Sequence, residues 1–193
     1  MIPCLSEKIS SLFIIHGVIK QEDKEVYSYS FEILLSNLLN LIAICVISII
    51  TKTIIETAFY LLAFMPLRQL AGGYHAKNHR RCFLIMMCIY ASFLLIVKFL
   101  TLQYSFILVA ANLAASIALI FKFSPMDDPN KPLSEKEISM FKRQSRIAIL
   151  AYTVFAILTF ILNETWALSM SLGMVSVALS LLASAIKRKF ARL

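Results

Sequence analysis

The sequence predicts an all-α integral membrane protein, a single membrane domain over residues 1–193 with about six transmembrane helices. Of the 193 residues, 60% are hydrophobic and only 16% are charged, and the mean hydropathy is +0.80. Ordinary globular domains have about 25% charged residues, so a soluble domain of this size cannot bury such an excess of apolar side chains. The apolar runs have the length of helices, and a barrel would instead alternate apolar and polar residues.

The first element that the sequence predicts is a helix over residues 1–20. Its apolar residues recur at intervals of three and four, at Ile2, Leu5, Ile9, Leu12 and Ile19. This spacing places them on one face of a helix, with most polar residues elsewhere. We therefore expect an amphipathic helix that lies in the inner membrane interface.

Six apolar runs follow, and each is a predicted transmembrane span. Their approximate bounds are 31–50, 53–67, 83–97, 105–121, 147–162 and 166–186. The second and third runs hold about 15 residues, which rise roughly 22 Å as a helix, whereas the hydrocarbon core is about 30 Å thick. We expect a thinner membrane, snorkelling of Arg68 and Arg81, or an intervening segment that enters the bilayer region as irregular backbone protected by protein.

The second half of the chain carries two further signals. Small residues follow one another in the fourth span at Ala110, Ala111, Ala114, Ala115 and Ala118. This spacing lets helix backbones approach closely and predicts a packing face, within one subunit or between two copies in a homodimer. Residues 124–133 hold three prolines and predict a rigid cytoplasmic connector. Ser134 and Glu137 have the spacing of a capping box, so a helix should begin there and continue into the fifth span.

Positive charge gathers on one side of the predicted spans. All but two of the 19 lysines and arginines lie at the termini or in the two segments that join spans two to three and four to five, and the exceptions are Lys52 and Lys98. The positive-inside rule then places both termini and residues 68–82 in the cytoplasm. The formal charge of +8 is therefore explained by the orientation of a multi-pass protein in the cell membrane. We expect lipid as a partner and no nucleic-acid partner.

One stretch combines glycine, histidine, cysteine and clustered basic residues. Residues 68–82 read RQLAGGYHAKNHRRC, in a sequence that is otherwise mostly aliphatic. A cysteine nucleophile reacts as the thiolate, which a base or positive surroundings favour. The residues before Cys82 that supply such surroundings are His75, Lys77, His79, Arg80 and Arg81. No other cysteine in the sequence has such neighbours, so Cys82 is a candidate nucleophile.

A dyad of His75 and Cys82 requires a bend in the chain. In one straight helix, seven residues would separate them by about 10 Å, whereas proton transfer requires about 3 Å. We expect His75 on a loop after Gly72 and Gly73, and a new helix that begins near Asn78. The paired glycines would let the backbone turn sharply and approach a substrate carbonyl.

The residues alone leave other interpretations open. A glycine pair beside basic residues is also typical of a flexible cytoplasmic turn, and Arg80 and Arg81 also suit the inner end of a span. His75, His79 and Cys82 would share one helical face and could bind zinc, although a fourth ligand is not evident and three adjacent cations oppose a divalent ion. A membrane transporter for a peptide or small solute and a non-catalytic scaffold are the alternatives from other functional classes.

Several residues of this stretch carry a resemblance to a known family. They are Arg68, Gly72, Gly73, Tyr74, His75, Ala76 and Cys82. With the seven-residue interval from histidine to cysteine, the Pro-rich connector and the layout of six spans, the chain resembles the AgrB family, the accessory gene regulator proteins B of Gram-positive quorum sensing.

The resemblance implies a cysteine endopeptidase without a cofactor, which acts on an AgrD-type autoinducing peptide precursor. Cys82 would be the nucleophile and His75 its base. The residues that support them would be Arg68, Gly72 and Gly73. The enzyme would release an acidic C-terminal fragment and hold the remainder as an acyl-thioester, until a cysteine or serine of the peptide closes a thiolactone or lactone ring. Basic side chains suited to the acidic fragment are Lys77, Arg80 and Arg81.

Overall fold

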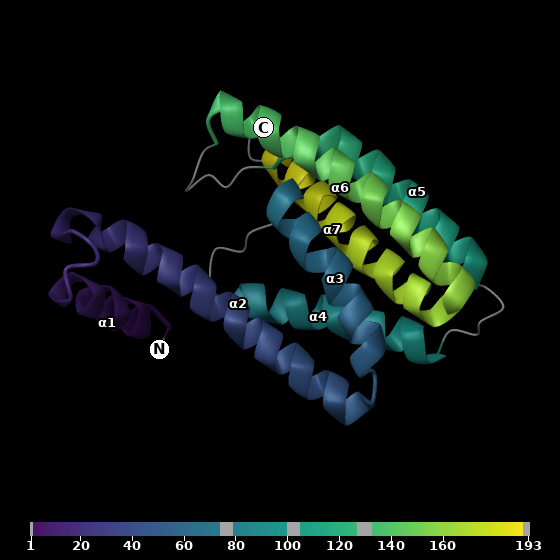
Figure 1. The fold of residues 1–193 in the computed structure, drawn as a ribbon, viewed down its shortest axis with the longest axis horizontal. Coiled ribbons are helices and arrows are strands. Elements are labelled where there is room, and N and C mark those ends of the chain that lie inside the picture. The colour runs from purple at the N-terminus through teal and green to yellow at the C-terminus, as the bar shows by residue number, and fades with distance from the viewer. Residues whose placement is uncertain (1, 74–78, 100–104, 127–132, 191–193) are drawn as a thin grey trace.

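The computed structural model describes residues 2–73, 79–99, 105–126 and 133–190, which form seven α-helices and one turn of 3-10 helix, η1 (Figure 1). The elements are α1 (Ile2–Ile15), η1 (Gln21–Asp23), α2 (Lys24–Thr51), α3 (Ile54–Ala71), α4 (His79–Phe99), α5 (Ser105–Phe123), α6 (Glu135–Leu162) and α7 (Glu164–Phe190). Six of these helices, α2 to α7, are long and apolar enough to cross a membrane. The all-α fold class with about six spanning helices is confirmed.

α7 is the central helix of the bundle. It packs most extensively against α3 and α5 and also contacts α6 and α4 (Figure 1). α3 approaches α7 closely at Gly173, where an added Cβ would lie 2.5 Å from the backbone oxygen of Tyr60. Fully buried Met170 and Met174 fill the space around this contact. The core therefore lies along α7.

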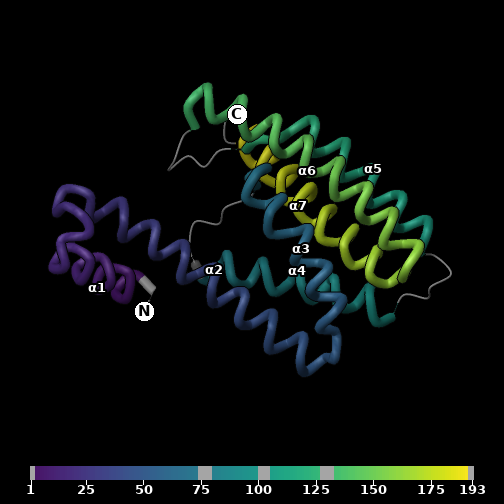
Figure 2. The backbone as a smooth tube through the Cα atoms, viewed as in Figure 1, coloured from purple at the N-terminus to yellow at the C-terminus, as the bar shows by residue number. Residues whose placement is uncertain are grey.

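α1 and the first half of α2 form a hairpin that stands apart from the bundle (Figure 2). α1 ends at Ile15 rather than near residue 20. Gly17 takes a φ of +70°, and the amides of Gly17 and Val18 donate hydrogen bonds to the carbonyls of Ile14 and Phe13. This bond pattern is a Schellman motif, which terminates a helix. The placement of α1 in the membrane interface remains a prediction.

α3 and α4 are longer than the spans that the sequence predicted. They contain 18 and 21 residues, which correspond to about 27 and 31 Å of helix. α3 continues through Pro66 and Arg68 to Ala71, although the apolar run ends at Leu67. How these two helices match the thickness of the membrane remains a prediction. Arg68 lies within the helix, and its guanidinium has hydrogen-bond partners at Gly72 and Ser180.

α5 packs through its larger side chains and not through its alanines. The buried residues of this helix are Ser105, Val109, Leu113, Ser116 and Ile120. The exposed residues of the alanine series are Ala110, Ala111, Ala114 and Ala118. The expected packing within the subunit is therefore wrong for most of this face, because a different face of α5, with Val109, Leu113 and Ile120, meets the neighbouring helices. A contact between two copies remains a prediction.

The capping box at the start of α6 is confirmed. The amide of Glu137 donates to Ser134 Oγ at 3.4 Å, and the amide of Ser134 donates to Glu137 Oε2 at 2.9 Å. Two amides at the helix N-terminus thereby gain partners. α6 then runs without interruption to Leu162. Of the predicted connector 124–133, residues 127–132 lie outside the described part of the chain.

Candidate active site around Cys82

Arg68 joins three parts of the chain. It lies on the last turn of α3, and its Nη1 donates hydrogen bonds to the carbonyl of Gly72 at 3.1 Å and to Ser180 Oγ on α7 at 2.8 Å. Ser180 Oγ itself donates to the carbonyl of Val177 at 2.7 Å, so it accepts from Arg68 with a free lone pair. The partly buried guanidinium is thus held between the end of α3, the glycine turn and α7.

Cys82 lies beside this guanidinium. It is half-buried in the first turns of α4 and lines a small cavity of about 40 Å³ with Arg68, Ser180 and apolar side chains. Arg68 and Cys82 are close enough to interact electrostatically. Burial of the sulfur opposes a thiolate at Cys82, whereas the positive charge of Arg68 favours it. The N-terminal end of α4 adds a smaller contribution of the same sign as that of Arg68.

The glycine pair is required by close contacts as well as by backbone angles. Gly72 and Gly73 have φ values of +77° and +144°, which L side chains rarely adopt. A Cβ on Gly73 would strike Nη1 of Arg68 and would lie 2.5 Å from Ser180 Oγ. A Cβ on Gly72 would strike the backbone oxygen of Met126. The positive φ values at both residues end α3 here, and Gly73 makes room for Arg68. The path of the chain directly after Gly73 lies outside the described residues.

The start of the Pro-rich connector lies against the glycine turn. The amide of Met126 donates to the carbonyl of Ala71 at 3.0 Å, and Met126 pairs with Gly72 in a parallel bridge. Ser124 Oγ donates to Ser145 Oγ at 2.8 Å and fixes the connector to α6. These bonds place the connector at the candidate site, a contact that the sequence did not indicate.

The other predicted site residues divide into two groups. Arg80 and Arg81 are exposed on the first turn of α4. His75 and Lys77 lie outside the described residues, so the approach of His75 to Cys82 and the zinc alternative remain predictions. Ser180 was missed by the sequence analysis. It is one of several serines on an apolar helix, and nothing in its local sequence distinguishes it from the others.

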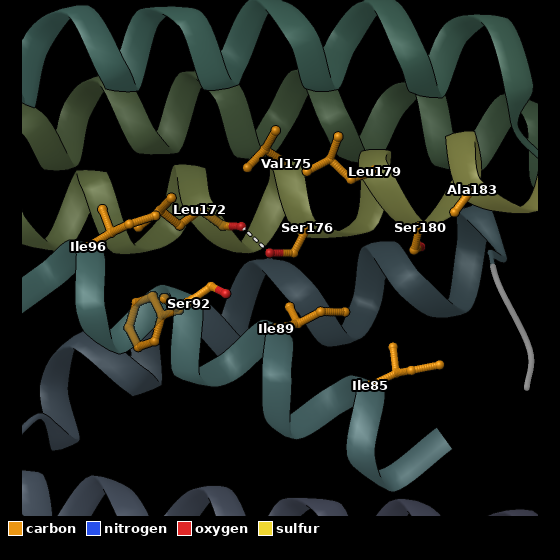
Figure 3. A pocket seen from close by; sticks show the side chains of 11 residues that line it. Ile85, Ile89, Ser92, Ile96, Leu172, Val175, Ser176, Leu179, Ser180 and Ala183 are labelled. Atoms are coloured by element: carbon orange, nitrogen blue, oxygen red, sulfur yellow. Dashed lines mark hydrogen bonds between the residues drawn. The ribbon is translucent and has the colours of Figure 1, made fainter. Parts of the chain in front are cut away.

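A larger cavity adjoins the Cys82 cavity between α4 and α7 (Figure 3). Its volume is about 430 Å³. It shares Ile85, Ile89 and Ser180 with the smaller cavity. Ile85 and Ile89 lie three and seven residues after Cys82, so they continue along the face of α4 on which Cys82 begins. The two cavities therefore lie next to each other along α4, and we call the larger one the α4–α7 groove.

Comparison with known proteins identifies similar sequences. A profile of the family AgrB, accessory gene regulator B, matches residues 6–182. An AgrB-like protein of Clostridium perfringens strain SM101 is 30% identical over 91% of this chain and 83% of its own length. The accessory gene regulator protein B of Staphylococcus aureus strain RF122 is 26% identical over 78% of each chain. Protein FsrB of Enterococcus faecalis is 26% identical over 63% of this chain and 50% of its own length. No solved structure matches the chain.

Proposed function

Because this chain belongs to the accessory gene regulator B family of quorum sensing, we propose that it is a membrane cysteine endopeptidase that matures an AgrD-type precursor peptide. Family membership and six helices suited to crossing a membrane make it a multi-pass membrane protein. The observation that carries the proposal is that Arg68 and Ser180 line one cavity with Cys82, while Gly73 leaves room for the guanidinium of Arg68. A partly buried cation that is fixed by hydrogen bonds next to a cysteine at a helix start is a site suited to a reactive thiolate.

In the first step, the Cys82 thiolate attacks the carbonyl carbon of one peptide bond in the precursor. The carbon–nitrogen bond then breaks, and His75 as its conjugate acid supplies the proton that the departing amine requires. The products are an acyl-thioester on Cys82 and a free C-terminal fragment. Arg68 favours the thiolate through its charge. Ser180 holds Arg68 in place and acts through it.

In the second step, a thiol or hydroxyl group of the bound peptide attacks the thioester carbonyl. The bond to Cys82 breaks, the thiolate is regenerated, and the proton of the attacking group passes to His75. A thiolactone or lactone ring results. Because exchange of one thioester for another is close to isoenergetic, the site must exclude water more than it must drive the reaction, and enclosure of Cys82 by apolar side chains supports this.

The acidic leaving fragment fits the basic residues on the water side of Cys82. Arg80 and Arg81 are exposed and immediately precede the nucleophile. Their guanidinium groups can bind carboxylates in a bidentate manner. Departure of the fragment into the cytoplasm would pull the first step forward.

The test uses purified protein in lipid nanodiscs with a synthetic AgrD-type precursor. Mass spectrometry of the native protein should detect an acyl adduct on Cys82 and a released C-terminal fragment. Cys82→Ala should abolish both products because it removes the sulfur that forms the bond. His75→Ala should slow adduct formation by roughly 10²- to 10⁴-fold, which is the usual contribution of a positioned base.

Cys88→Ala is the matched control, since Cys88 is exposed on the same helix and lines neither cavity. This variant should retain most of the activity. Cleavage that persists in Cys82→Ala protein would contradict the proposal. Loss of activity on addition of a chelator would favour the zinc alternative instead.

A further inference from the structure

The α4–α7 groove begins next to the Cys82 cavity and runs between α4 and α7, where its lining residues Ile85 and Leu179 are partly exposed. Residues from both helices line it, among them Ile96 and Phe93 on α4 and Leu172 and Val175 on α7 (Figure 3). Its volume of about 430 Å³ falls in the range of pockets that bind ligands, about 300–1,000 Å³. A molecule whose reacting carbonyl lies at Cys82 can therefore continue into a preformed space.

The hydroxyl groups in the lining are already committed to other partners. Ser92 Oγ donates to the carbonyl of Cys88 at 2.9 Å, and Ser176 Oγ donates to that of Leu172 at 2.7 Å (Figure 3). Ser180 donates to Val177 and accepts from Arg68. The remaining lining side chains are apolar. A polar ligand would lose its hydration here without gaining donors, so the groove selects apolar groups.

The two sides of Cys82 differ in charge and therefore suit different parts of the precursor. The exposed Arg80 and Arg81 precede the nucleophile, and the groove with its apolar lining follows it on the same helix. An acidic fragment matches the first environment and is excluded from the second. The segment that stays attached to Cys82 after cleavage must then lie on the groove side.

We propose that the α4–α7 groove binds the apolar side chains of the precursor that directly precede the cleaved bond. The inference rests on the proposed function and adds the substrate class, a peptide with aliphatic or aromatic residues on the acyl side. Occupancy of the groove holds the acyl part after the acidic fragment leaves and keeps water from the thioester. Ring closure then takes place before the acyl part dissociates.

Photo-crosslinking tests which part of the precursor enters the groove. The Cys82→Ala protein in nanodiscs is mixed with the synthetic precursor that carries photo-leucine either two residues before or two residues after the cleaved bond. Mass spectrometry then maps the adducts. Photo-leucine before the bond should crosslink to residues 85–96 and 172–183, and photo-leucine after the bond should not. Equal labelling from both positions, or acyl-side adducts elsewhere, would overturn the proposal.

A pair of variants tests the groove in the working enzyme. Ser92→Trp places a large side chain in the groove, whereas Ala91→Trp adds one at the neighbouring exposed position outside it. Ser92→Trp should slow acyl-enzyme formation at low peptide concentration by roughly tenfold or more, as expected for a filled apolar subsite. Ala91→Trp should change it by less than about threefold.

Alkylation of Cys82 by iodoacetamide reports whether the nucleophile is intact. In a background with the other three cysteines replaced by alanine, Ser92→Trp protein should react at the native rate, which shows that only the peptide site is blocked. If Ser92→Trp forms the acyl-enzyme at the native rate, the groove holds lipid or nothing and the inference is wrong. If the native protein forms no adduct with any precursor, the proposed function itself has failed.

Discussion

Ser180 and Gly73 show how single residues determine the position of a charge in this protein. A cation within a membrane-spanning helix needs hydrogen-bond partners, and Arg68 donates to the oxygens of Gly72 and Ser180. Both oxygens belong to neutral groups, so these two bonds satisfy donors without adding a negative charge beside Cys82. Gly73 contributes by lacking a side chain, since any Cβ would displace the guanidinium.

Ser180→Ala should lower the rate of acyl-enzyme formation by roughly 10- to 100-fold, because a hydrogen bond to a charged group is worth about 1.5–3 kcal/mol. The measurement is single-turnover mass spectrometry with saturating precursor. Ser180→Thr, which keeps a hydroxyl, should restore part of the rate. Ser169→Ala is the control, because Ser169 is buried on the same helix and donates only to its own helix, to the carbonyl of Thr165. A native rate in Ser180→Ala protein would remove Ser180 from the site.

Gly73→Ala should abolish processing while the fold remains intact. The new Cβ would strike Arg68 and Ser180, and a φ of +144° is strained for alanine. Gly17→Ala separates these causes, since Gly17 also has a positive φ of +70° but has nothing within 4 Å of an added Cβ. The readouts are thermal unfolding and acyl-adduct formation. Equal losses of activity in the two variants would show that strain, and not the contact with Arg68, makes Gly73 necessary.

The elements of the fold could be predicted from the sequence where the signal is local. Apolar runs, the capping box at Ser134 and the glycine turn were all recognisable, because each depends on residues close together in the chain. The hydrogen bond between Arg68 and Ser180, by contrast, joins residues more than 100 positions apart. The pairing of Met126 with Gly72 also joins distant parts of the chain. Contacts between residues far apart in the chain produce no periodic pattern or fixed spacing that could be recognised in the sequence.

Gly173→Ala should destabilise the contact between α3 and α7. Its Cβ would lie 2.5 Å from the Tyr60 backbone oxygen, which cannot move aside as a side chain can. We expect a net loss of about 1–3 kcal/mol, even though alanine has a higher helix propensity than glycine. Unfolding in mixed detergent micelles measures the change. Ala118→Leu, which adds volume at an exposed position of α5, should leave the unfolding midpoint close to native. A native unfolding midpoint for Gly173→Ala would show that α3 and α7 can separate at little cost.

At the scale of the whole molecule, hydrogen bonds join the helices at both ends of the bundle. Ser105 Oγ donates to Glu164, which connects the starts of α5 and α7. At the other end, Ala71 bonds to Met126 and Arg68 bonds to Ser180. This pairing agrees with helices that cross the membrane in alternating directions. It places the Cys82 site at the end where the basic connecting segments gather, which the positive-inside rule assigns to the cytoplasm.

Cysteine labelling in cells tests this orientation. In a cysteine-free background, single cysteines are introduced by Lys52→Cys, in the turn between α2 and α3, and by Arg143→Cys, near the start of α6. Both positions are exposed. A membrane-impermeant maleimide should label Lys52→Cys in intact cells and Arg143→Cys only after permeabilisation, because the positive-inside rule leaves Lys52 on the outer side. A single cysteine restored at position 82 should behave as Arg143→Cys does. Labelling of position 82 in intact cells would place the site outside the cytoplasm, where a newly made precursor could not reach it before export.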